Sequence, residues 1–305
     1  MSLIRPILNS YLRNIEKRRL AKTADVAEIR KRFALNARLF FHAPRGTQMA
    51  KVTLPDACEL MEITPRQVTS DLVIFYIHGG GFVFGSPETH AAMLAQLAAR
   101  TGARVVMPRY RLAPEYPYPA AIEDVENAYL ALVRSGVETG SIVIGGDSAG
   151  GALTFSLLGQ IMANRWPMPR GAFGFSPFVD FAHQGASHRE NAKREAVLPV
   201  ERAERMVQMY LAGADRNDPR ISALNADYQG APPVWICVGD TEILRDDARR
   251  IQQRLKDQGV AVTFLEAHDL PHVWPIFHNI LPEARQTLAT LASWIKALPR
   301  PAGES

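Results

Sequence analysis

Short apolar runs alternate with longer amphipathic stretches along most of this chain. From residue 72 onward, runs rich in β-branched and aromatic residues predict strands, and apolar residues spaced every three or four positions predict helices. The predicted strands are 72–77, 103–108, 141–146, 171–177, 232–239 and 260–267. The predicted helices are 91–102, 118–132, 150–165, 248–259 and 283–298. This alternation implies a mostly parallel, doubly wound α/β sheet with its site on loops at the carboxyl ends of the strands.

Two regions depart from the alternation. The N-terminal stretch predicts an amphipathic helix whose apolar face needs a partner. The apolar positions of that helix are Leu3, Ile4, Ile7, Leu8, Leu12 and Ile15. Residues 183–225 are polar and charged, with a helix but no clean strand. We therefore predict cap helices at 1–45, a main domain at 46–182 and 226–305, and a cap insertion at 183–225 that packs with the N-terminal helix over one sheet edge.

The composition is that of a globular protein. The 305 residues are 47% hydrophobic and 22% charged, which suits one large α/β domain. Cys58 and Cys237 fall in strand-like apolar stretches, outside any CxxC motif, so we expect reduced core cysteines in a cytoplasmic protein. No apolar run reaches the roughly eighteen residues of a membrane span, and Arg5 and Arg13 interrupt what would be a signal-peptide core. Stable membrane insertion is not expected.

The net charge of +4 is unevenly distributed, because basic residues outnumber acidic ones between Arg5 and Arg45. Such a segment binds nucleic acid or an anionic surface in some proteins. Without interleaved aromatics or a nucleic-acid motif, a solvated helix face is the simpler interpretation. We expect no nucleic-acid partner.

The motif Gly146-Asp147-Ser148-Ala149-Gly150 stands between an apolar strand and a helix. In this context G-x-S-x-G forms a nucleophile elbow, a tight turn between small residues that lifts the serine hydroxyl clear of the sheet. The helix that begins there directs free N–H groups toward the reacting centre. Ser148 is therefore the predicted nucleophile, in preference to an ordinary Gly/Ser turn.

A serine nucleophile needs a base, and His272 in EAHDLPHVWP lies on a loop after the last predicted strand. The order serine, acid, histidine along the chain is that of α/β-hydrolases. His268, in the same loop, is the alternative base. Five further histidines are expected to be surface or packing residues: His42, His90, His183, His188 and His278.

Three consecutive glycines interrupt YIHGGGFVFG at residues 76–85. Glycines permit positive φ and close approach of the backbone, which here would aim N–H groups at the oxyanion formed when Ser148 attacks a carbonyl. Gly80, Gly81 and Ala149, the residue after the nucleophile, are the predicted donors. A flexible turn is the alternative for the glycines taken alone.

Together these residues resemble the bacterial hormone-sensitive-lipase-like esterases, also called family IV carboxylesterases. The matching segments are HGGGF at 78–82, YRLAPEYPYPAAIED at 110–124, GDSAGG at 146–151, DPRISALNADYQGAPP at 218–233 and LPHVW at 270–274. The resemblance covers about residues 60–297 and implies an α/β-hydrolase fold with an eight-stranded sheet and a helical cap. It also implies no metal or organic cofactor, a structural His78, and a scaffold role for Arg111 and Glu115.

The sequence departs from the family pattern at the acid that would orient His272. The family has D-P-L-R-D after the seventh strand, and alignment with VGDTEILRDDA places Glu242 at the first position, thirty residues before His272. Asp240 is the alternative, because it also follows the strand and aspartate is the commoner acid. Asp246 is a third candidate, although Asp246 and its neighbour Asp247 also suit the first turn of a helix. We predict Glu242.

The resemblance implies a carboxylesterase that hydrolyses short-chain acyl esters through an acyl-enzyme, with a small-molecule ester as its partner. The pocket is predicted to be rimmed by Phe82 and Trp274. An amidase or arylformamidase, a long-chain lipase and a non-catalytic receptor are the alternatives. Plant hormone receptors resemble this family but lack the working histidine, so the presence of His272 argues against a receptor. Acyl length, alcohol, stereochemistry and oligomeric state, monomer or homodimer, stay open.

Overall fold

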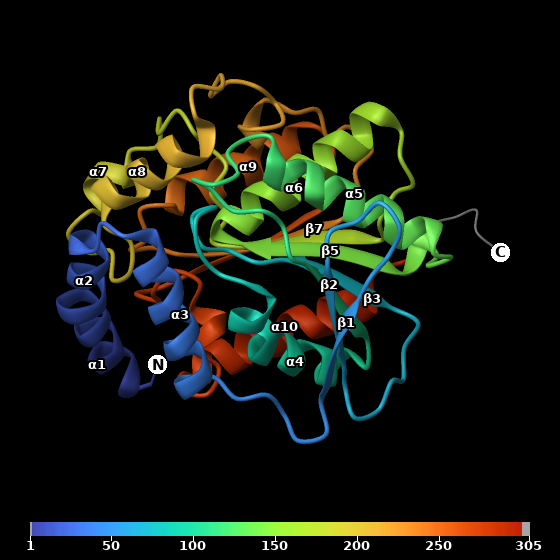
Figure 1. Cartoon of the computed structure of the whole chain (residues 1–305), viewed down its shortest axis with the longest axis horizontal. Coiled ribbons are helices and arrows are strands. Elements are labelled where there is room, and N and C mark those ends of the chain that lie inside the picture. The colour runs from blue at the N-terminus through green and yellow to red at the C-terminus, as the bar shows by residue number, and fades with distance from the viewer. Residues whose placement is uncertain (1, 301–305) are drawn as a thin grey trace.

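One sheet of eight strands forms the centre of the molecule (Figure 1). The structure is a computed structural model that describes residues 2–300, so residue 1 and residues 301–305 of the predicted domains lie outside it. The strands are β1 Gln48–Val52, β2 Leu60–Thr64, β3 Val73–Ile77, β4 Arg104–Pro108, β5 Ile142–Asp147, β6 Gly171–Phe175, β7 Val234–Gly239 and β8 Val262–Ala267. They lie in the order β1-β2-β4-β3-β5-β6-β7-β8. Strand β2 is antiparallel to both of its neighbours, β1 and β4, and the other neighbouring pairs are parallel, so the predicted mostly parallel α/β sheet is confirmed.

Helices cover both faces of this sheet (Figure 1). The α-helices are α1 Ile4–Tyr11, α2 Lys17–Lys22, α3 Val26–Phe40, α4 Pro87–Thr101, α5 Ala120–Arg134, α6 Ser148–Asn164, α7 Ser187–Glu190, α8 Val200–Leu211, α9 Arg245–Asp257 and α10 Pro282–Ala297. Shorter turns are the π-helical η1 Leu12–Glu16 and the 3-10 turns η2 Thr139–Ser141, η3 Ala223–Asn225 and η4 Trp274–Phe277. Helices α5, α6 and α9 lie on one face, and α4 packs against α10 on the other.

Burial explains which strands the sequence predicts. Strands β3, β5, β6 and β7 are buried along their whole length, because helices cover both faces, and such strands are continuous apolar runs. Strand β1 lies at the sheet edge with almost every residue exposed, so its sequence QMAKV carries no apolar alternation and is not predicted. The strand-like stretch around Cys58 corresponds to β2, with Cys58 itself in the preceding loop.

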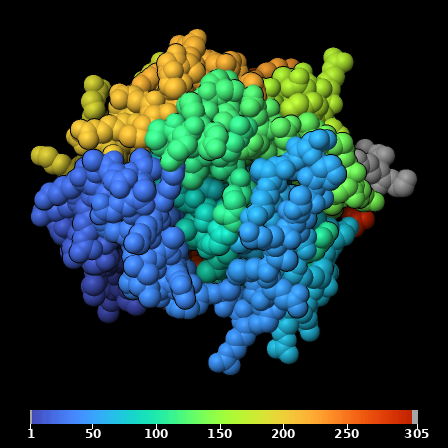
Figure 2. All heavy atoms as spheres, in the orientation of Figure 1, coloured from blue at the N-terminus to red at the C-terminus, as the bar shows by residue number. Residues whose placement is uncertain are grey.

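The N-terminal helices and the segment 183–225 pack against each other. Lys17 Nζ donates to the carbonyls of Ala192 and Glu195 at 2.7 and 2.9 Å, and Arg202 Nε donates to Leu20 O at 3.2 Å. Figure 2 shows the blue N-terminal surface meeting the yellow surface that contains α8. Further N-terminal contacts, to Val83 and His268, lie beyond the carboxyl ends of β3 and β8. The two segments therefore cover the carboxyl ends of the strands. The sequence had suggested that they cover one edge of the sheet.

The first helix is amphipathic, but its apolar face is only partly covered. Leu8 and Leu12 are buried, whereas Leu3 is 91% and Ile7 is 70% exposed. Ile4 and Ile15 are exposed as well. The expected partner of this face is therefore found for Leu8 and Leu12, while the rest of the face is exposed. Among residues 2–300, no helix is both long enough and apolar enough to cross a membrane.

Candidate active site

The turn from β5 into α6 holds Ser148 in a backbone conformation that non-glycine residues rarely adopt. Its φ is +51°, which matches the strained geometry of a nucleophile elbow. Small neighbours are required, because a Cβ on Gly150 would lie 2.1 Å from Ile77 O. The close approach of β3 to the start of α6 therefore forces glycine next to the serine. The turn leaves Ser148 in the wall of a cavity.

His272 lies between Ser148 and Glu242. Its Nε2 is 2.9 Å from Ser148 Oγ, and its Nδ1 is 2.6 Å from Glu242 Oε2. The other carboxyl oxygen of Glu242 accepts the Gly239 N–H at 2.6 Å and the Ser176 O–H at 2.8 Å. Because an ionised carboxylate can only accept, Nδ1 of neutral His272 carries the hydrogen, and the lone pair on Nε2 faces the serine hydroxyl.

Burial and mutual contact set the proton affinities of this pair. Burial raises the pKa of Glu242 above its ordinary value, and the hydrogen bond and charge of His272 offset that only in part. Burial acts to lower the pKa of His272, but the hydrogen bond and charge of Glu242 outweigh it, so that pKa is raised. Glu242 thus stabilises a protonated His272 in a place where burial alone would disfavour one.

The competing acids and base make other contacts. Asp240 Oδ2 is 2.7 Å from His268 Nδ1, and Asp240 Oδ1 accepts the Asp269 N–H at 2.8 Å. The side chain of His268 is 62% exposed. Asp246 accepts the N–H of Ser187 and Nε of Arg245. None of these hydrogen bonds involves Ser148 or His272, so the geometry groups Glu242 with the serine and histidine.

The glycine turn after β3 lies beside the serine. Gly80 and Gly81 line the same cavity, and Gly80 has a φ of +124°. A Cβ on Gly80 would lie 2.0 Å from Phe84 O, so this tight turn excludes larger residues. Within residues 2–300, the N–H groups of Gly80 and Gly81 donate to no protein acceptor. Ala149, second in α6, belongs to the first helical turn, whose N–H groups lack helical acceptors.

A buried carboxylate behind the serine holds the glycine turn in place. Asp147 Oδ1 accepts the Gly79 N–H at 2.9 Å and the Tyr76 O–H at 2.7 Å, and Oδ2 lies 3.4 Å from His90 Nε2. Burial acts to raise the pKa of Asp147, but these partners hold it below its ordinary value. The sequence analysis did not predict that Asp147 holds the glycine turn. A charged residue at the end of an apolar strand could have indicated such a buried contact.

His78 of the glycine motif is buried and contacts Tyr110 and Gly79. Its ring stacks on Tyr110 with centroids 4.3 Å apart, and Nδ1 is 2.8 Å from Gly79 O. Burial lowers the pKa of His78 to about 3, so the ring is neutral at physiological pH. This is the packing of a structural residue.

The cavity has a volume of about 510 Å³ and a mainly apolar wall. Its apolar lining comes from the N-terminal helices, the glycine turn, α8 and the loop after β8, and includes Leu12, Phe33, Phe82, Met206, Val207 and Val273. The predicted pocket residue Phe82 lines it, but Trp274 does not. Trp274 is fully buried and donates its Nε1–H to Thr287 of α10 at 2.9 Å, so this ring packs into the core and the adjacent Val273 takes the cavity position.

Three of the histidines expected at the surface or in packing, His90, His183 and His188, also line the cavity. His183 and His188 belong to the segment between β6 and α8, which has no apolar period that could place them from sequence. Over residues 2–300, no group of three or more His, Cys, Asp or Glu side chains is arranged to hold a metal ion.

The chain is similar in sequence and structure to several known proteins. Residues 74–276 match the sequence profile of a family described as alpha/beta hydrolase fold. The chain is 38% identical to an acetyl-hydrolase of Streptomyces hygroscopicus over 223 residues, 73% of this chain and 75% of the relative. It is 36% identical to an esterase of Acinetobacter venetianus over 233 residues, 76% of this chain and 77% of the relative. The crystal structure of an esterase from the bacterial hormone-sensitive lipase family aligns with a TM-score of 0.91 and 32% identity, covering 98% and 99% of the two chains.

The chain therefore belongs to the α/β-hydrolase fold family and falls among its bacterial hormone-sensitive-lipase-like esterases. The resemblance drawn from the sequence motifs is confirmed. So is the predicted enzyme class, a carboxylic ester hydrolase.

Proposed function

We propose that this protein hydrolyses small carboxylic esters with short acyl chains, using Ser148, His272 and Glu242 as its catalytic triad. One observation carries the proposal: hydrogen-bond distances of 2.9 and 2.6 Å link Ser148 Oγ to His272 and His272 to Glu242. Ser148 lies in the wall of a mainly apolar cavity that suits the carbon chains of a small ester.

The reaction follows from these positions. Ser148 Oγ attacks the ester carbonyl carbon while its proton passes to His272 Nε2, and Glu242 keeps its hydrogen bond to Nδ1. The resulting oxyanion accepts hydrogen bonds from the N–H groups of Gly80, Gly81 and Ala149. Preorganised donors of this kind contribute about 3–4 kcal/mol each in comparable enzymes.

His272 then returns the proton to the departing alcohol oxygen as the carbon–oxygen bond breaks, which leaves an acyl group on Ser148. Water then attacks the acyl carbon while His272 Nε2 takes a proton from it, and His272 passes that proton to Ser148 Oγ as the bond between Oγ and the acyl carbon breaks. The products are the carboxylic acid and free Ser148. No further reactant is needed to balance the two steps.

The division of the chain into domains is part of the proposal. Residues 1–45 and 183–225 would form one cap over the strand ends, and 46–182 with 226–305 the catalytic domain. The hydrogen bonds between Lys17 and the segment around Ala192 support this division. A mainly apolar cavity of limited volume supports the preference for short acyl groups.

A panel of p-nitrophenyl esters tests the substrate class. We expect kcat/KM to be highest for acyl chains of about two to eight carbons and lower from about twelve carbons upward, because the capped cavity limits chain length. Peak activity near sixteen carbons, with a jump at an emulsion interface, would instead indicate a lipase that uses the exposed face of α1. Absence of hydrolysis across the panel would indicate a receptor.

The pH dependence of kcat/KM tests the state of His272. Only the neutral ring can accept the serine proton, and Glu242 raises the pKa of His272, so the inactive protonated form persists to higher pH. We therefore expect activity to rise with pH through a group with a pKa above the ordinary value of about 6.5. In Glu242→Gln the pKa that governs the increase of the residual activity with pH should be lower than in the wild type. An acidic limb that moves upward in this variant contradicts the pairing.

A further inference from the structure

Four histidines line the cavity: His90, His183, His188 and His272. Two of them have partners at both ring nitrogens. His272 contacts Ser148 and Glu242, as described above. In His90, Nδ1 is 2.9 Å from Thr89 Oγ1 and Nε2 is 3.4 Å from an oxygen of Asp147. Neither ring has a nitrogen left for a ligand.

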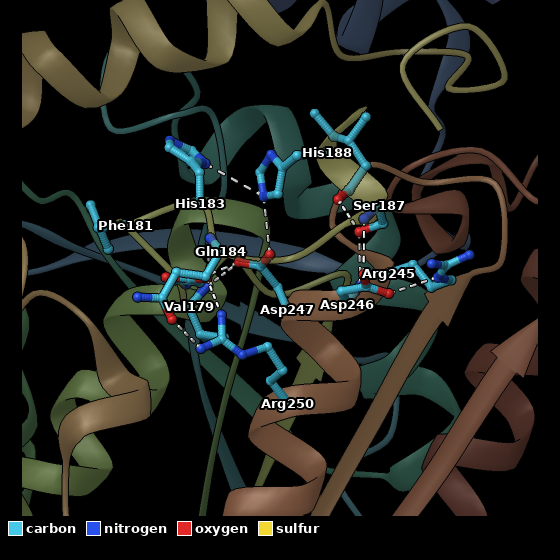
Figure 3. Close-up of polar contacts among 12 residues, drawn as sticks. Val179, Phe181, His183, Gln184, Ser187, His188, Arg245, Asp246, Asp247 and Arg250 are labelled. Carbon is cyan, nitrogen blue, oxygen red and sulfur yellow. Dashed lines mark hydrogen bonds and ion pairs between the residues drawn. The ribbon is translucent and has the colours of Figure 1, made fainter. Parts of the chain in front are cut away.

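The other two histidines contact each other on the side of the cavity formed by residues 178–188 (Figure 3). His183 Nδ1 is 3.4 Å from His188 Nε2, and His183 Nε2 is 2.7 Å from Glu204 Oε2, without the angle of a hydrogen bond. Burial lowers the pKa of His183, and the neighbouring His188 lowers it further, so this ring is neutral. Both nitrogens of His183 therefore face protein groups.

His188 is oriented through one nitrogen only. Its Nε2 lies 3.2 Å from Asp247 Oδ1, while Asp247 Oδ2 accepts the N–H groups of Val179 and Asp180, both at 2.9 Å (Figure 3). An Asp247 carboxylate that receives two backbone hydrogen bonds acts as an acceptor, so His188 Nε2 carries the hydrogen. In the neutral form of the ring, this hydrogen bond places the lone pair on Nδ1.

The segment that carries His188 is fixed to the start of α9. Ser187 N–H donates to Asp246 Oδ2 at 2.9 Å, and Ser187 Oγ donates to Ile243 O at 2.7 Å. Arg250 contacts Asp180 and donates to the side-chain oxygen of Gln184 at 2.9 Å (Figure 3). The imidazole is therefore held in one orientation before any ligand arrives, which is the condition for a selective polar contact.

The open nitrogen of His188 faces space that is not filled by protein. Within residues 2–300, Nδ1 has no hydrogen-bond partner, yet it is not among the buried polar atoms sealed from solvent. The side chain as a whole is only 7% exposed, and the cavity that it lines is mainly apolar. A substrate that covers Nδ1 without donating a hydrogen bond leaves a buried acceptor unpaired, which costs binding energy.

We propose that His188 Nδ1 accepts a hydrogen bond from a hydroxyl group of the substrate, so that the enzyme selects hydroxyl-bearing esters over their plain counterparts. The inference rests on the proposed function, because it places this ester in the cavity beside Ser148. His188 takes no part in proton transfer and acts on specificity. The hydroxyl can belong to the acyl part or to the alcohol part of the ester, and the experiment separates the two.

The test compares kcat/KM for matched esters by titration of the released acid. Ethyl butyrate is paired with both enantiomers of ethyl 3-hydroxybutyrate for the acyl part, and with 2-hydroxyethyl butyrate for the alcohol part. We expect the wild type to prefer the hydroxylated ester in at least one pair. His188→Phe, which keeps a ring but removes both nitrogens, should reduce that preference roughly five- to tenfold.

Two further variants exclude a merely structural effect. His188→Gln can still donate to Asp247 but has no acceptor in place of Nδ1, so it should lose the preference as well, and it carries the test if His188→Phe does not fold. His42→Phe, the same substitution at an exposed histidine that does not line the cavity, should leave the preference unchanged. Activity of His42→Phe on ethyl butyrate should stay within about threefold of wild type. For the His188 variants the measured quantity is the ratio of kcat/KM values for the two esters of a pair in the same protein, so a general change in activity does not enter the preference.

Equal preferences in the wild type and His188→Phe for every pair would overturn the inference. So would a preference that survives in His188→Gln but not in His188→Phe, because the contact to Asp247 would then be responsible. Either result leaves the proposed triad intact as long as Ser148→Ala abolishes hydrolysis of ethyl butyrate. Hydrolysis that persists in Ser148→Ala would instead defeat the proposed function.

Discussion

Ser148→Ala should lower kcat for p-nitrophenyl butyrate by roughly 10⁶, to the level left by the oxyanion donors and binding alone. The reason is that Ser148 Oγ is hydrogen-bonded to His272 Nε2, which positions the attacking oxygen and removes its proton. Without that oxygen no acyl-enzyme forms. The measurement is steady-state turnover of purified variant and wild type under the same conditions.

The fold should tolerate this change, because alanine removes one atom and the N–H groups of the turn stay in place. Ser135→Ala is the matched control, since Ser135 is exposed at the end of α5 and its hydroxyl donates to Leu132 O in its own turn. It should keep wild-type turnover. A Ser148→Ala protein that melts normally and still turns over within tenfold of the wild type would show that another nucleophile operates.

Glu242→Gln should lower turnover by about 10⁴, as expected for loss of a triad carboxylate. The surroundings of Glu242 explain the size of the effect. Gly239 N–H and Ser176 O–H both donate to Oε1, so a glutamine will place its oxygen there and turn its NH₂ group toward His272. That arrangement favours the wrong tautomer, with hydrogen on Nε2, and removes the charge that stabilises the imidazolium.

Asp240→Asn and Asp246→Asn are the matched controls for this variant. Asp240 contacts His268, and Asp246 anchors Ser187 and Arg245, so both variants should keep turnover within about tenfold of the wild type. A collapse of activity in Asp240→Asn, together with near-normal Glu242→Gln, would assign the triad acid to Asp240. Circular dichroism and thermal melting of all three proteins establish that they are compared at equal folding.

Local patterns predict the parts of this protein that depend on neighbouring residues. The strand, glycine-flanked turn and helix around Ser148 can be recognised from sequence, because a positive φ and close packing allow few residue types. Strands β3, β5, β6 and β7 can be recognised because burial along their whole length makes them apolar runs. The less buried β4 and β8 still carry β-branched residues. The edge strand β1 carries no such signal.

Side-chain directions that depend on distant segments could not be predicted. Trp274 points into the core because α10 supplies Thr287 as its partner, and nothing local distinguishes that from a place in the cavity wall. His188 reaches the cavity wall because Asp247, 59 residues further along the chain, holds its ring. The half-covered face of α1 likewise depends on which residues of the β8–α10 loop it meets.

Labelling with a fluorophosphonate tests the central claim most directly, because only a serine activated by a base reacts quickly with this probe. After digestion, mass spectrometry should find the probe on Ser148 alone, with loss of ester hydrolysis in proportion to labelling. Ser148→Ala should remain unlabelled, and Glu242→Gln should label far more slowly than the wild type. Rapid labelling at another serine, with Ser148 unmodified while hydrolysis is lost, would contradict the account.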